Sequence, residues 1–220
     1  KEIILYDPIS GINSPRPESR LPKFLDKAEM SRLLNVSHSF TPQGLRDQAV
    51  LEILYSAGLR VSEVAGVNLS DLDLSTGQVR VMGKGLRERI CFLGDPAKQS
   101  LEKFINFGRP KLMVNPWEKA LFLNYRGSRL TQRSIQKIVK KIASAAGVSI
   151  DVHTHTLRHT FATHLLDGGA DIRVVQELLG HSSPSTTEIY THVTQASARK
   201  AYLGAHPRSG SLAYKNDDGA

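Results

Sequence analysis

Apolar residues recur at helical spacing along most of the chain. The segment Gly44–Ala57 carries apolar side chains three and four residues apart, and Gly58 follows it where a C-terminal glycine cap is common. Asp26 and Glu29 form a capping-box pattern that opens a helix through about Leu34. The same spacing predicts further helices over 61–64, 95–107, 131–146, 154–166, 172–179, 186–193 and 196–203.

The pattern changes to alternation between residues 71 and 93. Apolar and polar residues alternate there around turn glycines, which predicts a small antiparallel sheet or a pair of hairpins. The stretch ALFLN, residues 120–124, predicts one more short strand. We therefore expect a mainly α fold with a small antiparallel β-sheet, in the α+β class.

Composition suggests how the chain is divided. Four prolines stand within the first 22 residues among glycine, serine and asparagine, which is typical of a linker. We interpret residues 1–22 as an inter-domain linker, 23–206 as one folded domain and 207–220 as a C-terminal tail. On this interpretation, a domain N-terminal to the linker lies outside the sequence.

The charge balance favours a polyanionic partner. Lys and Arg number 29 against 21 Asp and Glu, a formal net charge of +8, and binding to phosphates releases counterions. A basic soluble domain would show the same excess, so charge alone does not decide. The single cysteine, Cys91, excludes an intrachain disulfide and fits a reducing compartment, so we expect a cytoplasmic protein. No apolar run approaches the roughly 20 residues of a membrane span, and we expect no membrane partner.

Arg60, Glu63 and Lys84 are the first candidates for chemistry. Arg60 stands at a turn between two predicted helices, where its guanidinium can donate two hydrogen bonds to a phosphate and Glu63 can orient it. An exposed ion pair, which stabilises little, is the alternative. Lys84 lies between two glycines at a predicted hairpin tip and could protonate a leaving oxygen, although charged turns are common.

The word HTLR places His155 and Arg158 three residues apart, on one face of a helix. A solvated surface helix would show the same spacing. His159 follows His155 by four residues, as in a zinc-binding pair, but the glutamate of HExxH is missing. We therefore expect no metal site and interpret His153, His159 and His164 as packing or hydrogen-bonding residues.

His181 and Tyr190 complete an ordered set. His181 follows a glycine at a predicted helix end, and Tyr190 lies nine residues later within another predicted helix. Each alone is usually a capping or packed side chain. Two arginines, one lysine and two histidines can together hold and neutralise a phosphodiester without a metal, and a tyrosine can attack its phosphorus.

These words resemble the tyrosine recombinase family, most closely the Xer-like site-specific recombinases. They are GLRVSEV (58–64), GKG (83–85), HTLRH (155–159) and LGHSSPSTTEIYTHV (179–193), and the resemblance covers about residues 20–207. It implies the family's catalytic-domain fold for 23–206, without the N-terminal DNA-binding domain, and it implies no cofactor. The catalytic residues that it implies are Arg60, Lys84, His155, Arg158, His181 and Tyr190, with Glu63 supporting Arg60.

The resemblance also implies a reaction and partners. The expected reaction is transesterification through a 3′-phosphotyrosyl intermediate, serving DNA integration and excision or chromosome dimer resolution. The expected partners are double-stranded DNA at the nucleoid and a homotetramer, or a heterotetramer with a paralogue, with a monomer as the alternative for an isolated fragment. The predicted DNA contacts are Arg87, Arg89, Gln132 and Arg133, the last two at base edges.

Three other functions compete with this interpretation. A type IB topoisomerase uses the same chemistry without partner protomers. A DNA-binding module that has lost activity would keep the basic surface alone. A metallonuclease would need clustered acidic ligands, whereas the acidic residues of this sequence are scattered.

Overall fold

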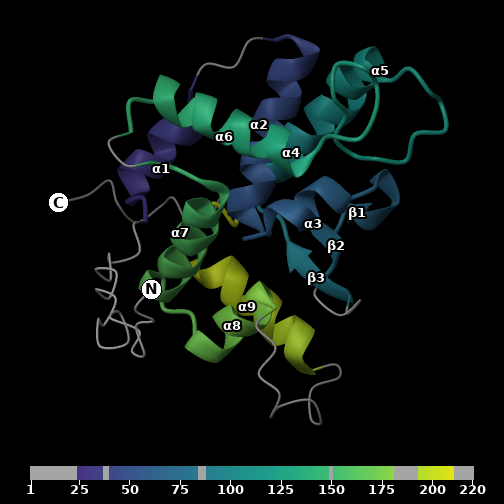
Figure 1. The fold of residues 1–220 in the computed structure, drawn as a ribbon. Coiled ribbons are helices and arrows are strands. Elements are labelled where there is room, and N and C mark those ends of the chain that lie inside the picture. Colours follow the sequence, from purple (N-terminus) through teal and green to yellow (C-terminus); the bar gives the residue numbers. More distant parts are fainter. Residues whose placement is uncertain (1–23, 37–39, 84–87, 149–150, 181–192, 211–220) are drawn as a thin grey trace, which may run out of the picture.

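The computed structural model describes residues 24–36, 40–83, 88–148, 151–180 and 193–210 (Figure 1). Within these ranges the chain is mainly helical, with one three-stranded antiparallel sheet in the order β1–β2–β3. The predicted α+β fold class is therefore confirmed.

The elements follow the predicted segments closely. The helices are α1 (Lys27–Leu34), α2 (Pro42–Ser56), α3 (Val61–Gly66), α4 (Asp95–Lys103), α5 (Arg109–Leu112), α6 (Gln132–Ala145), α7 (Thr154–Asp167), α8 (Ile172–Leu179) and α9 (Val193–Ala205). The strands are β1 (Leu72–Asp73), β2 (Gln78–Met82) and β3 (Glu88–Phe92). A 3₁₀ turn, η1 (Leu69–Asp71), precedes β1, and a π-helical turn, η2 (Phe104–Gly108), joins α4 to α5.

Two predicted elements differ from the structure. Residues 120–124 form no named strand, because only isolated bridges join Ala120 to Asn68 and Leu123 to Arg129. The predicted helix 95–107 changes to π-helical geometry at Phe104. The predicted helix 186–193 lies outside the described residues except for its last position.

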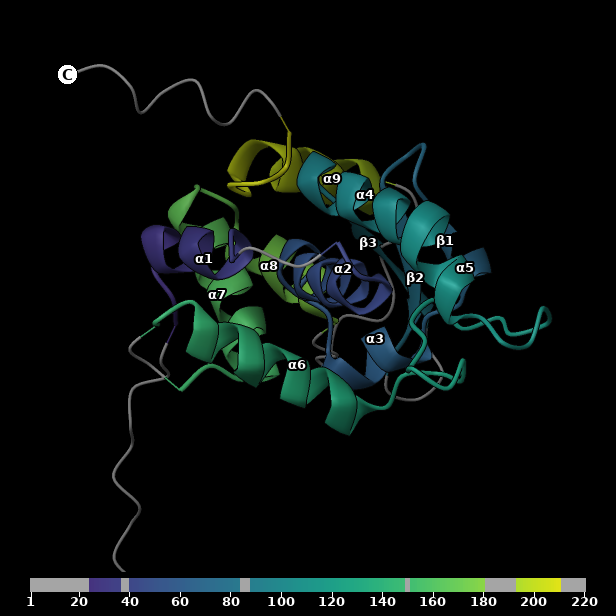
Figure 2. The same ribbon diagram turned by 90° about the horizontal axis from the view of Figure 1, so that it is seen from above.

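Helix α2 forms the centre of the fold. Its consecutive residues 49–56 are all buried, and Figure 2 shows α4 and α9 on one side of it with α6 and α7 on the other. Thr41 caps its N-terminus, where Oγ1 accepts from the Gly44 N–H at 3.1 Å, and Pro42 fits the first turn. A helix that is buried on every side is a rigid support for the elements around it.

Contacts from distant residues fix both ends of α3. Gly58 adopts a φ of 58°, and a Cβ at this position would overlap the Phe161 ring, so the turn before α3 can approach α7 only with a glycine. At the other end, Arg129 Nη1 donates to the carbonyl oxygens of Gly66 and Val67 at 2.9 and 3.2 Å. The position of α3 is thus set by elements on two sides.

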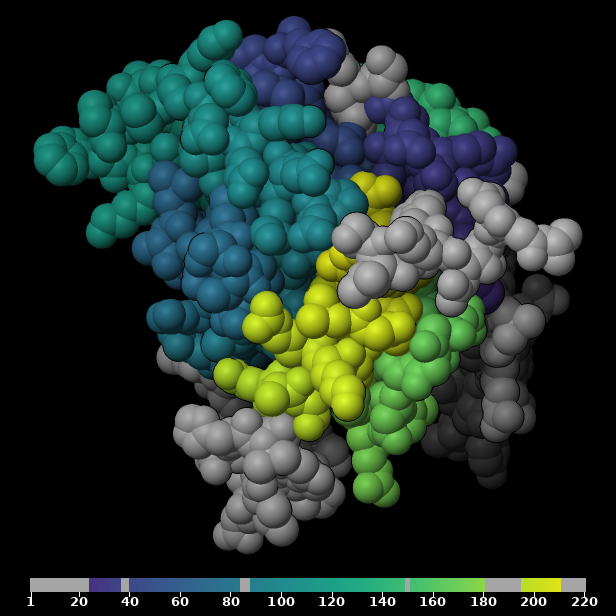
Figure 3. All heavy atoms as spheres, turned by 180° about the vertical axis from the view of Figure 1, so that it is seen from behind, coloured from purple at the N-terminus to yellow at the C-terminus, as the bar shows by residue number. Residues whose placement is uncertain are grey.

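Helix α9 packs on its own domain. Tyr202 is buried, and its hydroxyl lies 2.8 Å from Ser56 Oγ in α2. Figure 3 shows α9, in yellow, against the green segment that contains α7 and α8. His206 is fully buried among the rings of Tyr55, Phe161 and Tyr202, and burial lowers its pKa to about 3.

The packed region extends into the predicted tail. Arg208 Nη2 donates to Glu52 Oε1 at 2.6 Å, and Ser209 Oγ donates to the Leu203 carbonyl oxygen at 2.8 Å. The predicted tail 207–220 therefore starts too early, because these contacts hold residues 207–210 to the core. Residues 211–220 lie outside the described part.

Candidate active site

Arg60 and Glu63 form the first part of the site at the start of α3. The Arg60 backbone N–H donates to Glu63 Oε2 at 2.7 Å, and Arg60 Nη1 donates to Oε1 at 3.1 Å. Glu63 is 3% exposed as a side chain, whereas Arg60 is 34% exposed. A buried carboxylate is thus in contact with a guanidinium that keeps part of its surface open to solvent, while the supporting role of Glu63 stays a prediction.

Arg89 on β3 is the second partner of Glu63. Its Nη1 donates to Glu63 Oε1 at 2.6 Å and its Nη2 donates to Oε2 at 2.9 Å, a bidentate ion pair. Burial alone would raise the pKa of Glu63, but hydrogen bonds from Arg89 and Arg60 outweigh burial and lower it. Glu63 is therefore a carboxylate at neutral pH.

Arg158 lies in α7 and is 8% exposed. Its Nη1 donates to the Gly58 carbonyl oxygen at 2.5 Å, and its Nη2 donates to the Leu179 carbonyl oxygen. Burial, and then the charge of Arg60, lowers the pKa of Arg158 to about 10, so the group remains protonated at neutral pH. The structure thus brings both predicted catalytic arginines to one place, Arg60 from the N-cap of α3 and Arg158 from α7.

The C-terminal end of α8 is where the three arginines meet. Three successive carbonyl oxygens there accept hydrogen bonds from Arg89 Nε, Arg158 Nη2 and Arg60 Nη2; they belong to Leu178 (3.3 Å), Leu179 and Gly180 (3.4 Å). The partial negative charge at a helix C-terminus favours cations in this position. Gly180 ends the helix in the left-handed conformation, with a φ of 64°.

We call these three arginines, gathered around Glu63 and the end of α8, the arginine cluster. Its three guanidinium charges face one carboxylate, so two positive charges remain uncompensated among the described residues. Cys91 adds no charge, because burial raises the pKa of its thiol to about 11. An excess of guanidinium groups with a partly exposed member is a suitable site for a phosphate.

His155 occupies the first turn of α7, three residues before Arg158, and is exposed. The exposed face of a helix N-terminus also presents free backbone N–H groups to an anion. His155 and Arg158 therefore share a helix, as predicted, but one is open to solvent and the other is buried. Their placement around a common phosphate stays a prediction.

Several predicted residues lie outside the described part of the chain: Lys84, Arg87, His181 and Tyr190. The neighbouring described residues bracket them. Met82 and Glu88 pair across β2 and β3, so residues 84–87 connect two strands that border the arginine cluster through Arg89. Gly180, which accepts from Arg60, directly precedes His181 in the sequence.

Two of the predicted DNA contacts are exposed at one helix end. Gln132 and Arg133 open α6, where Thr131 caps the helix by accepting from the Ser134 N–H at 3.2 Å. Both side chains are exposed to solvent, which is compatible with the predicted role. Arg89, by contrast, is engaged with Glu63 and is only 15% exposed as a side chain.

The ion pair between Arg89 and Glu63 is a contact of the candidate site that the sequence alone does not predict. The alternation in β3 contains the signal, because Arg89 and the buried Cys91 are two residues apart and so lie on the same face of the strand. That face turns toward Glu63. The charge of Arg89 and its place on the hairpin strand after Lys84 predict a DNA contact, and that contact stays a prediction.

Of the three histidines predicted to pack or hydrogen-bond, the exposed His153 has its Nε2 3.0 Å from Asp151 Oδ2, and the other two are in packing positions. His164 Nδ1 lies 2.8 Å from the Tyr55 hydroxyl, and His159 stacks edge-on against Phe24. Across the described ranges, no group of three or more His, Cys, Asp and Glu residues is placed to hold a metal ion. None of the described helices is long and apolar enough to cross a membrane.

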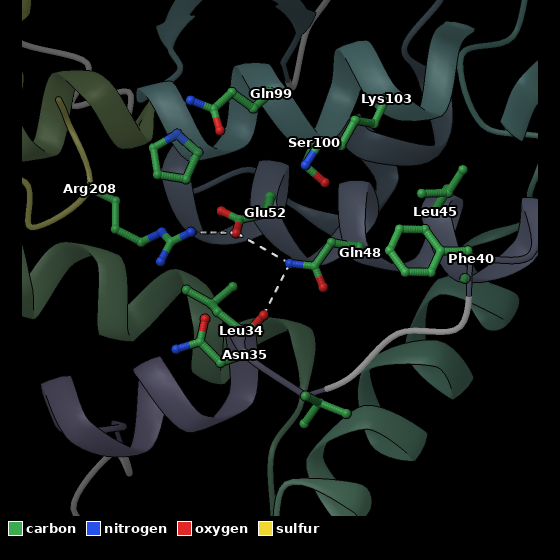
Figure 4. Close-up of a pocket in the computed structure, with 13 residues that line it drawn as sticks. Leu34, Asn35, Phe40, Leu45, Gln48, Glu52, Gln99, Ser100, Lys103 and Arg208 are labelled. Atoms are coloured by element: carbon green, nitrogen blue, oxygen red, sulfur yellow. Dashed lines mark hydrogen bonds and ion pairs between the residues drawn. The ribbon is translucent and has the colours of Figure 1, made fainter. Parts of the chain in front are cut away.

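A cavity of about 340 Å³ lies elsewhere, between α1, α2, α4 and the C-terminal turn. Figure 4 shows Glu52 pointing toward Arg208 and Gln48 inside it. Gln48 Nε2 donates to Glu52 Oε1 at 3.3 Å and to the Leu34 carbonyl oxygen at 3.1 Å. The cavity shares no lining residue with the arginine cluster. Its ion pair consists of one negative side chain, Glu52, and one positive side chain, Arg208, so the two charges cancel.

Comparison with known proteins gives one consistent result. The chain matches the phage integrase family over residues 23–197. It is 46% identical to tyrosine recombinase XerC of Pelotomaculum thermopropionicum and 47% identical to tyrosine recombinase XerD of Oceanobacillus iheyensis. Each alignment covers 95% of this chain and 70% of the relative.

Solved structures agree with the sequence relatives. The crystal structure of XerA recombinase superposes with a TM-score of 0.68 at 30% identity, over 84% of this chain and 65% of that one. XerH site-specific recombinase bound to difH substrate, in a pre-cleavage complex, gives a TM-score of 0.64 at 29% identity, over 84% of this chain and 54% of that one. The chain thus spans less than two thirds of these two solved proteins.

Proposed function

The chain belongs to the phage integrase family, and we propose that it breaks and rejoins DNA strands at specific sites by transesterification through Tyr190. The observation that carries the proposal is the arginine cluster. Arg60, at the N-cap of α3, and Arg158, in α7, converge on the end of α8, directly before the sequence that contains His181 and Tyr190. Two uncompensated positive charges at this point suit a scissile phosphate.

The proposed reaction is balanced without an external energy source. The Tyr190 phenolate oxygen attacks the phosphorus, a bond forms to the 3′-phosphate, and the bond from phosphorus to the 5′-oxygen breaks. His155 takes the phenol proton, and Lys84 gives a proton to the leaving 5′-oxygen. The 5′-hydroxyl of a second strand then attacks the phosphotyrosine and restores a phosphodiester.

The arginines act on the non-bridging oxygens. Arg60 is oriented by Glu63 yet keeps about a third of its side chain exposed, so it can donate to an oxygen without first leaving its partner. Arg158 is held by two carbonyl oxygens and needs little reorganisation as charge develops. His181 adds a hydrogen bond to the same phosphate in this proposal.

We propose double-stranded DNA as the substrate and chromosome dimer resolution as the biological role. Support comes from relatives named XerC and XerD and from a XerH structure bound to its difH substrate. The proposed assembly on DNA is a tetramer of this chain or of this chain with a paralogue, acting at the nucleoid in the cytoplasm. Gln132 and Arg133 at the start of α6 are the proposed contacts to base edges.

The test is covalent capture. Wild-type protein is incubated in EDTA with a mixed pool of nicked DNA duplexes, so that the short strand diffuses away after cleavage and the covalent complex accumulates. We expect a protein–DNA adduct from wild type and from Tyr125→Phe, an exposed tyrosine 70% accessible to solvent. Tyr190→Phe should give none. Capture by Tyr190→Phe, or strict dependence on a divalent metal, would overturn the proposal.

Relaxation by a topoisomerase is the less favoured alternative, because the curated relatives are named recombinases. The two activities separate on plasmids with two copies of the captured site. Recombination changes the plasmid products, whereas a topoisomerase removes supercoils and leaves the order of sequences unchanged. A relaxed plasmid without recombinant products would favour the alternative.

A further inference from the structure

We propose that Arg89 is a positioning residue of the active site, which holds Glu63 and the end of α8 in place and, through both, orients Arg60. The proposal rests on the proposed function, since it concerns the residue that would bind the scissile phosphate. It gives Arg89 a role different from the DNA contact that its charge suggested.

The first support is the way in which Glu63 is shared. Arg89 donates to both carboxylate oxygens, at 2.6 and 2.9 Å, whereas Arg60 Nη1 reaches only one of them, at 3.1 Å. The shorter, two-point contact fixes the plane of the carboxylate. Arg60 then takes its direction from a carboxylate that it does not have to hold by itself.

The second support is the contact with α8. Arg89 Nε donates to the Leu178 carbonyl oxygen at 3.3 Å, two residues before the carbonyl that accepts from Arg60. A Cβ added to Gly180 would lie 3.2 Å from three atoms of the Arg89 side chain, so this glycine packs directly on it. Arg89 therefore links the two groups that Arg60 contacts, Glu63 and Gly180.

The third support is that the hydrogen-bond donors of Arg89 are already engaged within the protein. Three of the nitrogen atoms of Arg89 already donate within the protein, and the side chain is 15% exposed. Arg60 is more than twice as exposed and makes longer contacts, at 3.1 and 3.4 Å. Of the two arginines on Glu63, Arg60 is thus the one that is open to a phosphate, and Arg89 is the one committed to the protein.

The variant Arg89→Met tests the proposal, with Arg80→Met, an exposed arginine on the neighbouring strand β2, as the matched control. Two quantities are measured on the duplex captured by wild type: the single-turnover cleavage rate at saturating DNA, and the salt dependence of DNA affinity. We expect Arg89→Met to lower the rate on the order of 10- to 100-fold, as small misplacements do, with an unchanged salt slope. Arg80→Met should keep the wild-type rate.

Two further variants separate positioning from general stability. Arg89→Lys keeps the charge but cannot bridge both oxygens, so it should remain slow. In the Glu63→Gln background, Arg89→Met should slow cleavage little further, because both changes act through one carboxylate. Folding is followed by thermal unfolding, and the rate is expressed per folded molecule.

The Glu63 pKa, measured by carbon NMR of its carboxyl group, gives a readout that needs no cleavage. It should rise in Arg89→Met, because burial would then act without its main opposing contact. A full cleavage rate per folded molecule, or a salt slope reduced by about 1 with the rate retained, would overturn the proposal. If wild type captured no DNA, the proposed function would fail, while the Glu63 pKa would still decide whether Arg89 holds that carboxylate.

Discussion

Glu63 and Glu52 are both buried carboxylates paired with arginine, but they sit in opposite electrostatic surroundings. Glu63 accepts from two guanidinium groups and one backbone N–H, and its pKa lies below the usual 4.5. Glu52 accepts from one arginine, Arg208, and from Gln48, while its Oε2 has no hydrogen-bond partner among the described residues. Burial therefore raises the pKa of Glu52.

The comparison separates a binding region around Glu63, where positive charge is left over for a ligand, from a holding region around Glu52, where an ion pair joins two parts of the fold. In the part of the chain that the structure describes, Glu63 is the one carboxylate paired with the arginine cluster, so two of its three positive charges have no carboxylate partner. Around Glu52, Arg208 balances a single charge and joins the C-terminal turn to α2. A buried ion pair is thus weak evidence of function by itself, and the uncompensated charge is what points to a ligand.

The largest effect is expected from Arg158→Lys, inside the arginine cluster. Lysine keeps the positive charge but loses the fork that holds two carbonyl oxygens and presents the remaining donors. The cleavage rate at saturating DNA should fall on the order of 10² to 10³-fold, as for the loss of one preorganised donor. Single-turnover capture measures it. A rate close to wild type would remove Arg158 from the proposed mechanism.

Two matched variants should show that the two carboxylates differ in their effect on the cleavage rate. Glu63→Gln weakens the orientation of Arg60, so the cleavage rate should fall on the order of tenfold or more. Glu52→Gln keeps the size of the side chain and lies outside the arginine cluster, so its rate per folded molecule should equal that of wild type. Equal losses in both variants would contradict the division into a binding region and a holding region.

The same pair should also differ in the pH dependence of stability. The folded pKa of Glu63 is lowered, so its contribution to stability is present above pH 4.5 and is lost as the pH falls through the folded pKa. The folded pKa of Glu52 is raised, so its contribution is greatest below pH 4.5 and is lost as the pH rises through the folded pKa.

Urea unfolding between about pH 2 and pH 8 measures both contributions, because the Glu63 change falls below pH 4.5 and the Glu52 change above it. Relative to wild type, Glu63→Gln should become more destabilising as the pH rises, and Glu52→Gln should become less destabilising. Parallel curves for the two variants would show that the surroundings of the two carboxylates do not differ as described.

The smallest effect is expected on DNA affinity at the start of α6. Arg133→Met should relax the preference for the base that it contacts, and should reduce the salt slope of DNA binding by about 1 because a positive charge leaves the DNA surface. Lys103→Met is the matched control, since Lys103 is exposed on α4 and borders the Glu52 cavity. A slope lowered equally by both variants would mean that affinity follows net charge rather than a defined DNA-binding surface.

Local patterns predicted most of the fold. The capping box at Asp26 and the glycine at position 58 mark helix ends that the structure reproduces, because such signals involve neighbours within one or two turns. The change from helical spacing to alternation at residues 71–93 likewise predicted the antiparallel sheet that the structure contains. The strand predicted for residues 120–124 was wrong, because their apolar run is buried without regular strand pairing.

The contacts that define the two regions could not be predicted in this way. Arg60 meets Gly180 across 120 residues, and Arg208 meets Glu52 across 156. No local spacing encodes which carboxylate an arginine will reach at such separation. The catalytic assignment of Arg60 and Arg158 came from a family resemblance, and the pairing of Arg89 with Glu63 emerged only from the fold.

The most direct test is to identify the atom that becomes attached to DNA. The captured complex is digested with protease and nuclease, and the modified peptide is sequenced by mass spectrometry. We expect a nucleotide joined through its 3′-phosphate to Tyr190. Attachment at another residue, or through a 5′-phosphate, would contradict it.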